Sequence, residues 1–269
     1  MIKLIVTDID GTLVNDGKKI GPKTVQAIKK ARSKGILTVL CTGRPLSGVK
    51  DYLEELGLDS DQDYVITFNG AACQKVKSGQ ALFEYVLEND KVEKLLEFSQ
   101  KAGVKSQTIT LDNQIYTPNE DVSSYTVMDS FYTHMPLHIR SKVWPKDLAV
   151  AKFMWADQKE NIDRALKEVQ ASFPSNLYTV RSEDWFFEFQ NQDATKGKAV
   201  LKLAQTLGIK PHEVMTVGDQ MNDLTMFAPE FFAVAMGNAV AEIKAASKAQ
   251  TLSNNEDGLG VAIEKYVLS

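Results

Sequence analysis

The chain contains few cysteines and few histidines. Cys41 and Cys73 are its two cysteines among 269 residues, and they lack the spacing of a zinc site or of a C-x-x-C redox motif. We expect both thiols to be reduced and buried, which excludes a disulfide scaffold. His134, His138 and His212 show no metal-site or catalytic-triad spacing, so we assign them to surface or packing positions.

The chain also lacks an excess of positive charge and a long hydrophobic run. Its formal net charge is -4 and it has no long basic stripe, so the sequence does not show the electrostatic footprint of a nucleic-acid-binding protein. No apolar run approaches the roughly 18 residues of a membrane-spanning helix. Asp8 and Asp10 interrupt the N-terminus before the core of a signal peptide could form. We therefore expect a cytoplasmic protein with no nucleic-acid or membrane partner.

Hydrophobic patterning predicts an α/β fold with a mainly parallel sheet. Residues 3–7 and 36–40 are short apolar runs typical of buried strands, and residues 22–34 between them have apolar positions at helical spacing. A strand, a helix and a second strand of these lengths indicate a βαβ unit. A further strand is predicted at residues 64–67. From residue 196 the alternation resumes, with a helix to 207, a strand at 214–217, a helix from 222, a strand at 232–235 and a last helix ending near 266.

The middle of the chain has a different pattern. Residues 74–87 are expected to form a hairpin with its turn at Ser78-Gly79, and amphipathic helices are predicted at 90–102 and 159–171. We therefore assign residues 1–84 and 191–269 to a core domain and residues 85–190 to an inserted α/β domain.

Two carboxylates follow the first predicted strand. Side chains at i and i+2 point to the same face of an extended segment, so Asp8 and Asp10 are expected to stand side by side, and a hard divalent cation between them would relieve their repulsion. Gly11 allows a sharp turn, and the Thr12 hydroxyl can order the loop. Alone, these residues are equally consistent with an ordinary turn.

Polar residues also follow the other predicted core strands. Thr42-Gly43-Arg44 follows the second strand, Asn69-Gly70 the third, and Gly218-Asp219-Gln220-Met221-Asn222-Asp223 a later one, while Lys196 begins the helix after the insert. Ligands of open parallel sheets bind at the carboxyl ends of the strands. Taken singly, each segment is consistent with a turn, a helix cap or a solvated lysine. Taken together, they predict a phosphate-binding site.

The same motifs carry a resemblance to a known family. Asp8-x-Asp10-Gly11-Thr12, Thr42-Gly43-Arg44, Lys196 and Gly218-Asp219-x-x-Asn222-Asp223 resemble the four motifs of the haloacid dehalogenase superfamily. Their order and the long insert are similar to the Cof-type subfamily of bacterial sugar phosphatases. Residues 67–71 and 236–239 also look like segments of that subfamily. The resemblance implies a Rossmann-like core and an inserted cap domain that closes over the substrate and sets specificity.

The resemblance also implies a role for each motif residue. Asp8 would be the nucleophile that forms an aspartyl phosphate, and Asp10 the general acid and base. Mg²⁺ would be bound by the Asp8 and Asp219 carboxylates and by the backbone carbonyl of Asp10. Asp223 would support these ligands. The residues expected to bind phosphate are Ile9, Thr42, Gly43, Lys196 and Asn222. Arg44 and Asn69 are candidates for contacts with the substrate or the cap. The expected ligands are small phosphate esters, sugar phosphates first, bound by a monomer or a weak homodimer.

Two other functions remain open from the sequence. A phosphomutase of the same superfamily has similar motifs but returns the phosphoryl group to a sugar. A phospho-accepting regulatory protein also uses Asp, Mg²⁺, Thr and Lys, but its acidic pair and its phospho-accepting Asp follow different strands. Here Asp8 and Asp10 share one loop, which favours a phosphatase.

Overall fold

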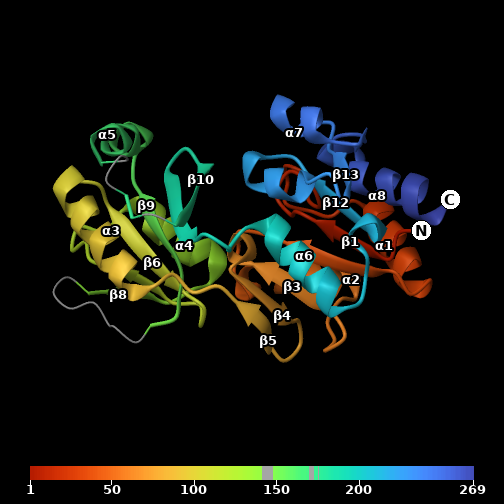
Figure 1. Ribbon diagram of the computed structural model, residues 1–269, viewed down its shortest axis with the longest axis horizontal. Coiled ribbons are helices and arrows are strands. Elements are labelled where there is room, and N and C mark those ends of the chain that lie inside the picture. The colour runs from red at the N-terminus through yellow and green to blue at the C-terminus, as the bar shows by residue number, and fades with distance from the viewer. Residues whose placement is uncertain (141–147, 170–172, 175) are drawn as a thin grey trace. The chain divides into compact units, whose positions relative to one another are not determined.

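The structure is a computed structural model that describes all residues except 141–147, 170–172 and 175 (Figure 1). It divides into two compact units, one formed by Met1–Phe83 with Thr195–Ser269 and the other by Glu84–Ala194. In the described part of the chain, no helix is long and apolar enough to cross a membrane.

The first unit is built on an eight-stranded sheet. Its strands are β1 (Leu4–Thr7), β2 (Leu37–Cys41), β3 (Tyr64–Thr67), β4 (Ala72–Lys75), β5 (Ala81–Glu84), β12 (Val214–Gly218), β13 (Phe232–Ala235) and β14 (Ala249–Gln250). Their order is β14-β13-β12-β1-β2-β3-β4-β5. Neighbouring strands from β14 to β3 pair in parallel, and β4 runs antiparallel to β3. The predicted mainly parallel α/β sheet is therefore confirmed.

Helices connect these strands. They are α1 (Pro22–Ser33), α2 (Lys50–Leu56), α6 (Lys196–Thr206), α7 (Ala241–Ala246) and α8 (Gly258–Ile263), with the short 3₁₀ helices η1 (Leu46–Gly48), η2 (Phe68–Gly70), η4 (Pro211–Glu213), η5 (Met221–Phe227) and η6 (Asn254–Glu256) and a terminal π-helical turn η7 (Glu264–Leu268). Helix α1 packs against α2 and α8, whereas α6 and α7 pack against η5. Because parallel crossovers are right-handed, the connections that run from β1 to β3 and those from β12 to β14 lie on opposite faces of the sheet.

The strand order places β1 at the centre of the sheet, between β2 and β12. Thr7 at the end of β1 pairs with Leu40 on one side and Val217 on the other. The chain thus proceeds from β1 through β2 and β3 toward one edge of the sheet, and the later strands β12, β13 and β14 lie on the other side of β1. Such a reversal of strand order is where open α/β sheets bind ligands.

The second unit has a six-stranded sheet of its own, in the order β10-β11-β9-β6-β7-β8. Its elements are α3 (Asn89–Ala102), β6 (Ser106–Thr110), β7 (Ile115–Thr117), α4 (Ser124–Thr133), β8 (Leu137–Ile139), β9 (Val150–Ala156), α5 (Lys159–Val169), β10 (Leu177–Glu183) and β11 (Phe186–Asn191). Trp155, Phe187 and Phe189 form its core together with residues of α3 and α5. The indole N–H of Trp155 donates to the Ser99 hydroxyl at 2.8 Å, so the one polar atom of the ring has a partner.

Two predicted elements differ in detail. The expected helix from residue 222 is the 3₁₀ helix η5. An Asp223 carboxylate oxygen caps its start by accepting the backbone N–H groups of Asp219 and Gln220 at 2.8 and 3.1 Å. The helix expected at 159–171 is described to Val169, and its last two predicted residues lie outside the described part of the chain.

A buried carboxylate joins α1 to the loop before β3. Asp63 accepts both terminal guanidinium nitrogens of Arg32 and the backbone N–H and hydroxyl of Ser60. Burial raises the pKa of Asp63, but these hydrogen bonds outweigh burial, and the net effect is a lowered pKa.

We expect Asp63→Asn to lower the free energy of unfolding by about 1–3 kcal/mol at neutral pH, because the charged acceptor is lost. A carboxyl whose pKa is lowered by folding stabilises the fold above its unfolded pKa of about 3.9, and this contribution is lost as the pH falls through the folded pKa. The difference between wild type and variant should therefore shrink in acid. Urea unfolding at several pH values measures it. Asp51→Asn on α2, at an exposed position, is the matched control, and a pH-independent difference would contradict the assignment.

Candidate active site

Asp8 and Asp219 follow the adjacent central strands β1 and β12. The Asp8 backbone N–H donates to the Val217 carbonyl at 3.1 Å, so β12 holds the first residue beyond β1 in place. Because parallel strands end at one edge of the sheet, two residues more than 200 positions apart in the chain meet there. Both side chains are buried, at 5% exposure for Asp8 and 3% for Asp219.

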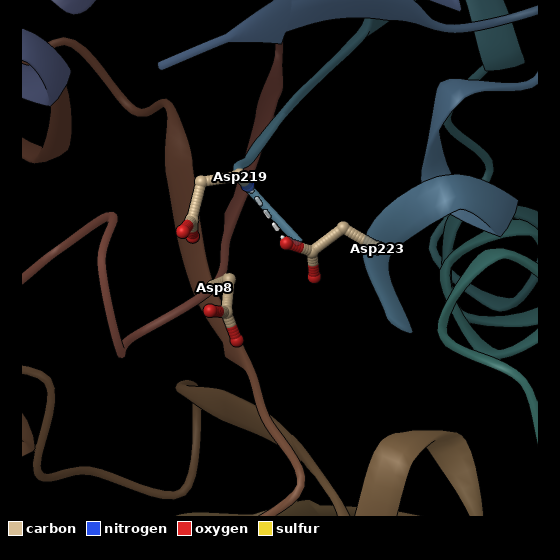
Figure 2. A group of neighbouring side chains, drawn as sticks. All are labelled: Asp8, Asp219 and Asp223. Carbon is tan, nitrogen blue, oxygen red and sulfur yellow. Dashed lines mark hydrogen bonds between the residues drawn. The ribbon is translucent and has the colours of Figure 1, made fainter. Parts of the chain in front are cut away.

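Asp223 completes a group of three carboxylates with Asp8 and Asp219 (Figure 2). One oxygen from each lies within 4.8 Å of the others. Asp223 is fully buried at the start of η5, and the Asp219 backbone N–H that it accepts is the dashed contact in Figure 2. This places Asp8, Asp219 and Asp223 together, as the sequence predicted for a cation site.

Lys196 lies among these carboxylates. Its fully buried ammonium donates to Asp8 and Asp223, both at 2.6 Å. Burial lowers the pKa of Lys196, but the Asp223 and Asp8 carboxylates outweigh it and raise the pKa, so the side chain is charged. The Thr195 hydroxyl caps α6 by accepting the Lys198 N–H at 3.3 Å, which sets Lys196 at the first position of the helix.

The negative charge of the group is not balanced by Lys196 alone. Burial raises the pKa of Asp8 well above its ordinary range, opposed by Lys196 and assisted by Asp223 and Asp219. Burial and, after it, the charge of Asp223 raise the pKa of Asp219 to about 7, whereas the hydrogen bond from the Thr12 hydroxyl lowers it. Three carboxylates that share one ammonium provide an excess of oxygen donors and negative charge. This donor set fits a hard divalent cation such as Mg²⁺ or Ca²⁺, which binds carboxylate oxygens.

The loop after Asp8 is held close to Asp219. Thr12 donates its hydroxyl to Asp219 Oδ1 at 2.8 Å. Gly11 has φ +77°, and a Cβ at this position would lie 2.4 Å from Asp219 Oδ2. Both the left-handed backbone and the close approach therefore require glycine. Asn238, for which the sequence predicted no role, donates to the Gly11 carbonyl at 2.8 Å and to Asp219 Oδ2 at 3.4 Å.

Asp10 has different partners from Asp8. Arg44 binds its carboxylate with two nitrogens, Nε at 2.8 Å and Nη2 at 2.6 Å, and Lys18 binds it at 2.7 Å. Burial raises the pKa of Asp10, but these two cations outweigh burial and lower it. Asp10 is still close enough to Asp8 for its charge to raise the pKa of Asp8, and a cation bound between the two stays a prediction. The strand ends at Thr7, so the alternation of an extended segment does not continue to Asp10.

The remaining predicted residues surround the ends of β2 and β3. The buried Thr42 accepts the Arg44 backbone N–H on its hydroxyl at 3.1 Å. The Asn69 side chain lies against Gly43, where a Cβ would be 3.0 Å from Asn69 Oδ1. Asn222 donates to the same Asn69 oxygen at 3.3 Å. Through Asn69, these contacts join the second motif to the fourth.

The turn after β3 has an uncommon backbone. Phe68 and Asn69 have φ values of 52° and 56°, and Gly70 follows at 103°. A left-handed conformation is unfavourable for a bulky residue such as Phe and persists only where the surroundings impose it. Here Gly70 packs so closely against the Thr195 carbonyl that a Cβ would lie 2.4 Å from it. The turn therefore links Asn69 to the start of α6, where Lys196 lies.

Ile9 is the last of the predicted phosphate-binding residues. Its side chain is buried, and its carbonyl accepts the backbone N–H groups of Thr12, Leu13 and Val14 at 3.3, 3.0 and 3.0 Å. These bonds close the tight turn that follows Asp8. The contribution of Ile9 is thus through its backbone, at the base of the loop that carries Asp8 and Asp10.

Two residues of this site were not predicted from the sequence, Lys18 and Asn238. Lys18 has φ 58° in a turn, and nothing in the spacing of Asp10 and Lys18 indicates that the chain folds back on itself. Asn238 lies within the segment 236–239 that resembles the Cof-type subfamily, just beyond a predicted strand end. The strand-end argument used for Asp8 and Asp219 could have found it.

Comparison with known proteins supports the resemblance over the whole chain. A family model described as haloacid dehalogenase-like hydrolase matches residues 5–263. A Bacillus subtilis (strain 168) protein named "Putative phosphatase YxeH" is 40% identical over 270 residues, with 100% of both chains covered.

Solved structures agree. A haloacid dehalogenase-like hydrolase from Bacteroides thetaiotaomicron has 29% identity and a TM-score of 0.85, covering 98% of this chain and 99% of its own. The HAD subclass IIB sugar phosphatase BT4131 has 27% identity and a TM-score of 0.80, covering 99% and 100%. The predicted resemblance and fold class are confirmed. The chain therefore belongs to the family of haloacid dehalogenase-like hydrolases and is a phosphatase, an enzyme that hydrolyses phosphoric monoesters.

Proposed function

We propose that the chain is a Mg²⁺-dependent phosphatase of small phosphorylated metabolites, with sugar phosphates as the foremost substrate class, and that it acts through an aspartyl phosphate on Asp8. The observation that carries this proposal is the position of Asp8 between Lys196 and Asp219 at the ends of the central strands. The similarity to a protein named as a sugar phosphatase supports the substrate class. The inserted unit is proposed to select among these substrates.

In the first step, an oxygen of Asp8 attacks phosphorus, and the bond between phosphorus and the ester oxygen breaks. The alkoxide that leaves takes a proton from Asp10. Lys196, charged and 2.6 Å from Asp8, offsets the negative charge that spreads over the phosphoryl oxygens. Thr42, the Gly43 and Ile9 amides and Asn222 are proposed to hold those oxygens.

In the second step, water attacks the phosphorus of the aspartyl phosphate, Asp10 accepts the proton of that water, and the bond to Asp8 breaks to release phosphate. The lowered pKa of Asp10 favours the ionised form that this step needs. As an acid in the first step, Asp10 must hold a proton, so its ion pairs with Arg44 and Lys18 have to break. Once released from Asp10, Arg44 is proposed to contact the substrate. Asn69, which accepts a hydrogen bond from Asn222, stays a second candidate.

We propose that Asp8, Asp219 and the backbone carbonyl of Asp10 hold the cation, and that Asp223 orients this group. Lys196 binds one Asp223 oxygen, and two backbone N–H groups bind the other. Because both oxygens already have partners, Asp223 is proposed to support the ligands of the cation. When bound, Mg²⁺ supplies positive charge that screens the approach of one anion to another.

Removal of divalent cations should abolish turnover of p-nitrophenyl phosphate. The physical reason is that Asp8 and Asp219 would then face an anionic ester with only Lys196 to offset their charge. The assay compares enzyme treated exhaustively with EDTA before and after Mg²⁺ is returned, and circular dichroism checks that the treated chain is folded. Turnover that survives EDTA would refute the metal requirement.

A screen of phosphomonoesters in Mg²⁺ buffer tests the substrate class. Sugar phosphates are expected to give the largest kcat/KM, and a flat profile or a preference for non-carbohydrate esters would refute that class. A coupled assay with a sugar bisphosphate as activator separates hydrolysis from mutase activity: free phosphate is the product of the proposed enzyme, and an isomeric sugar phosphate is that of a mutase.

A further inference from the structure

Asn238 joins the nucleophile loop to an aspartate of the acidic group. It lies in the turn after β13, and its side-chain nitrogen donates to the Gly11 carbonyl at 2.8 Å and, over a longer distance of 3.4 Å, to Asp219 Oδ2. Gly11 belongs to the loop that carries Asp8 and Asp10, whereas Asp219 follows β12. One amide group therefore contacts both segments that are proposed to hold the cation.

The Asn238 side chain is itself held in position. Its oxygen accepts the Asn254 backbone N–H at 3.0 Å. The backbone on both sides is also tied down, because the Gly237 N–H donates to the Leu252 carbonyl at 2.9 Å and the Val240 N–H donates to the Asp219 carbonyl at 3.0 Å. An amide whose oxygen and flanking backbone are engaged cannot turn freely, so its nitrogen is aimed at Gly11 and Asp219.

The Asp219 carboxylate receives one donor on each oxygen. Thr12 binds Oδ1 at 2.8 Å and Asn238 approaches Oδ2. Each oxygen keeps a further lone pair, so these two donors fix the orientation of the carboxylate and leave it able to bind a cation. Residues that orient a metal ligand in this way typically change metal affinity or activity by about 10–100-fold when they are replaced.

We propose that Asn238 is a positioning residue that orients Asp219 and the Gly11 loop for the divalent cation. This inference rests on the proposed function, in which Asp219 is a ligand of that cation. Asn238 acts through Gly11 and Asp219 and has no contact with the substrate in the proposal. Its loss should therefore weaken cation binding more than it changes the rate at saturating cation.

The test is titration of the substrate-free chain with Mg²⁺ alone, measured by isothermal titration calorimetry. Asn238→Ala is expected to bind Mg²⁺ about 10–100-fold more weakly than wild type, while kcat at saturating Mg²⁺ changes much less. If the alanine variant does not fold, Asn238→Ser replaces it, because a hydroxyl on a shorter side chain cannot reach both partners.

Asn255→Ala is the matched control. Asn255 belongs to the same group of loops. Its side-chain oxygen accepts the Asp16 backbone N–H, and its side-chain nitrogen donates to the Asp16 carboxylate. In the described part of the chain, no hydrogen bond joins it to Asp219. Its Mg²⁺ affinity should equal that of wild type. Unchanged affinity in Asn238→Ala, or an equal loss in Asn255→Ala, would overturn the proposal. If wild type itself binds no Mg²⁺, the proposed metal dependence fails, and the role of Asn238 fails with it.

Discussion

Asp8→Asn is expected to reduce turnover of p-nitrophenyl phosphate by about 10⁴-fold or more, as is typical when an enzyme's nucleophile is removed. An amide oxygen has little nucleophilicity toward phosphorus, so no aspartyl phosphate can form. Steady-state release of p-nitrophenol measures the loss. Mass spectrometry of acid-quenched enzyme should find a phosphoryl adduct on Asp8 in wild type and none in the variant.

The stability of the same variant separates a catalytic role from a structural one. Burial raises the pKa of Asp8 well above its ordinary range, so at neutral pH the ionised carboxylate costs folding free energy in the absence of a cation. Asp8→Asn removes this charge and leaves an oxygen that can accept from Lys196. We therefore expect the cation-free variant to unfold at the same temperature as wild type or higher. Near-normal turnover would refute the nucleophile assignment, and a large fall in Tm would indicate a structural role.

Asp10→Asn should slow both half-reactions, each by about 10²–10⁴-fold, the usual contribution of general acid–base catalysis. The variant can neither protonate the leaving alkoxide nor take a proton from water. An activated ester such as p-nitrophenyl phosphate needs little protonation, so the loss in the first step should be larger with an alkyl phosphate. Rapid-quench single-turnover measurements resolve formation and decay of the aspartyl phosphate.

The control for Asp10 is Asp16→Asn in the same loop. The Asp16 carboxylate is exposed and binds Asn254 and Asn255, so both half-reactions of this variant should keep their wild-type rates. An Asp10→Asn enzyme in which the aspartyl phosphate decays at the wild-type rate would exclude Asp10 as the base.

The fold could be predicted largely from local pattern. The apolar runs at β1, β2 and β3 are buried strands of the expected extent, because short apolar segments separated by an amphipathic helix have few alternatives to a βαβ unit. The 3₁₀ winding of η5 was not predicted, because a helical pattern over seven residues does not distinguish a 3₁₀ helix from an α-helix. The Asp223 carboxylate that caps it by accepting two backbone N–H groups is likewise invisible to helical periodicity.

The residues that follow the central strands can be predicted from the sequence, since parallel strands bring their carboxyl ends to one edge of a sheet and so bring Asp8 near Asp219. The charge that each carboxylate meets depends instead on the tertiary structure. Asp8 meets Lys196 from 188 positions away, whereas Asp10, two residues later, meets Arg44 and Lys18. Electrostatic interaction depends on distance and burial in space, which neighbouring positions in a chain need not share. Two carboxylates that look equivalent in the sequence therefore have pKa values shifted in opposite directions, one raised and one lowered.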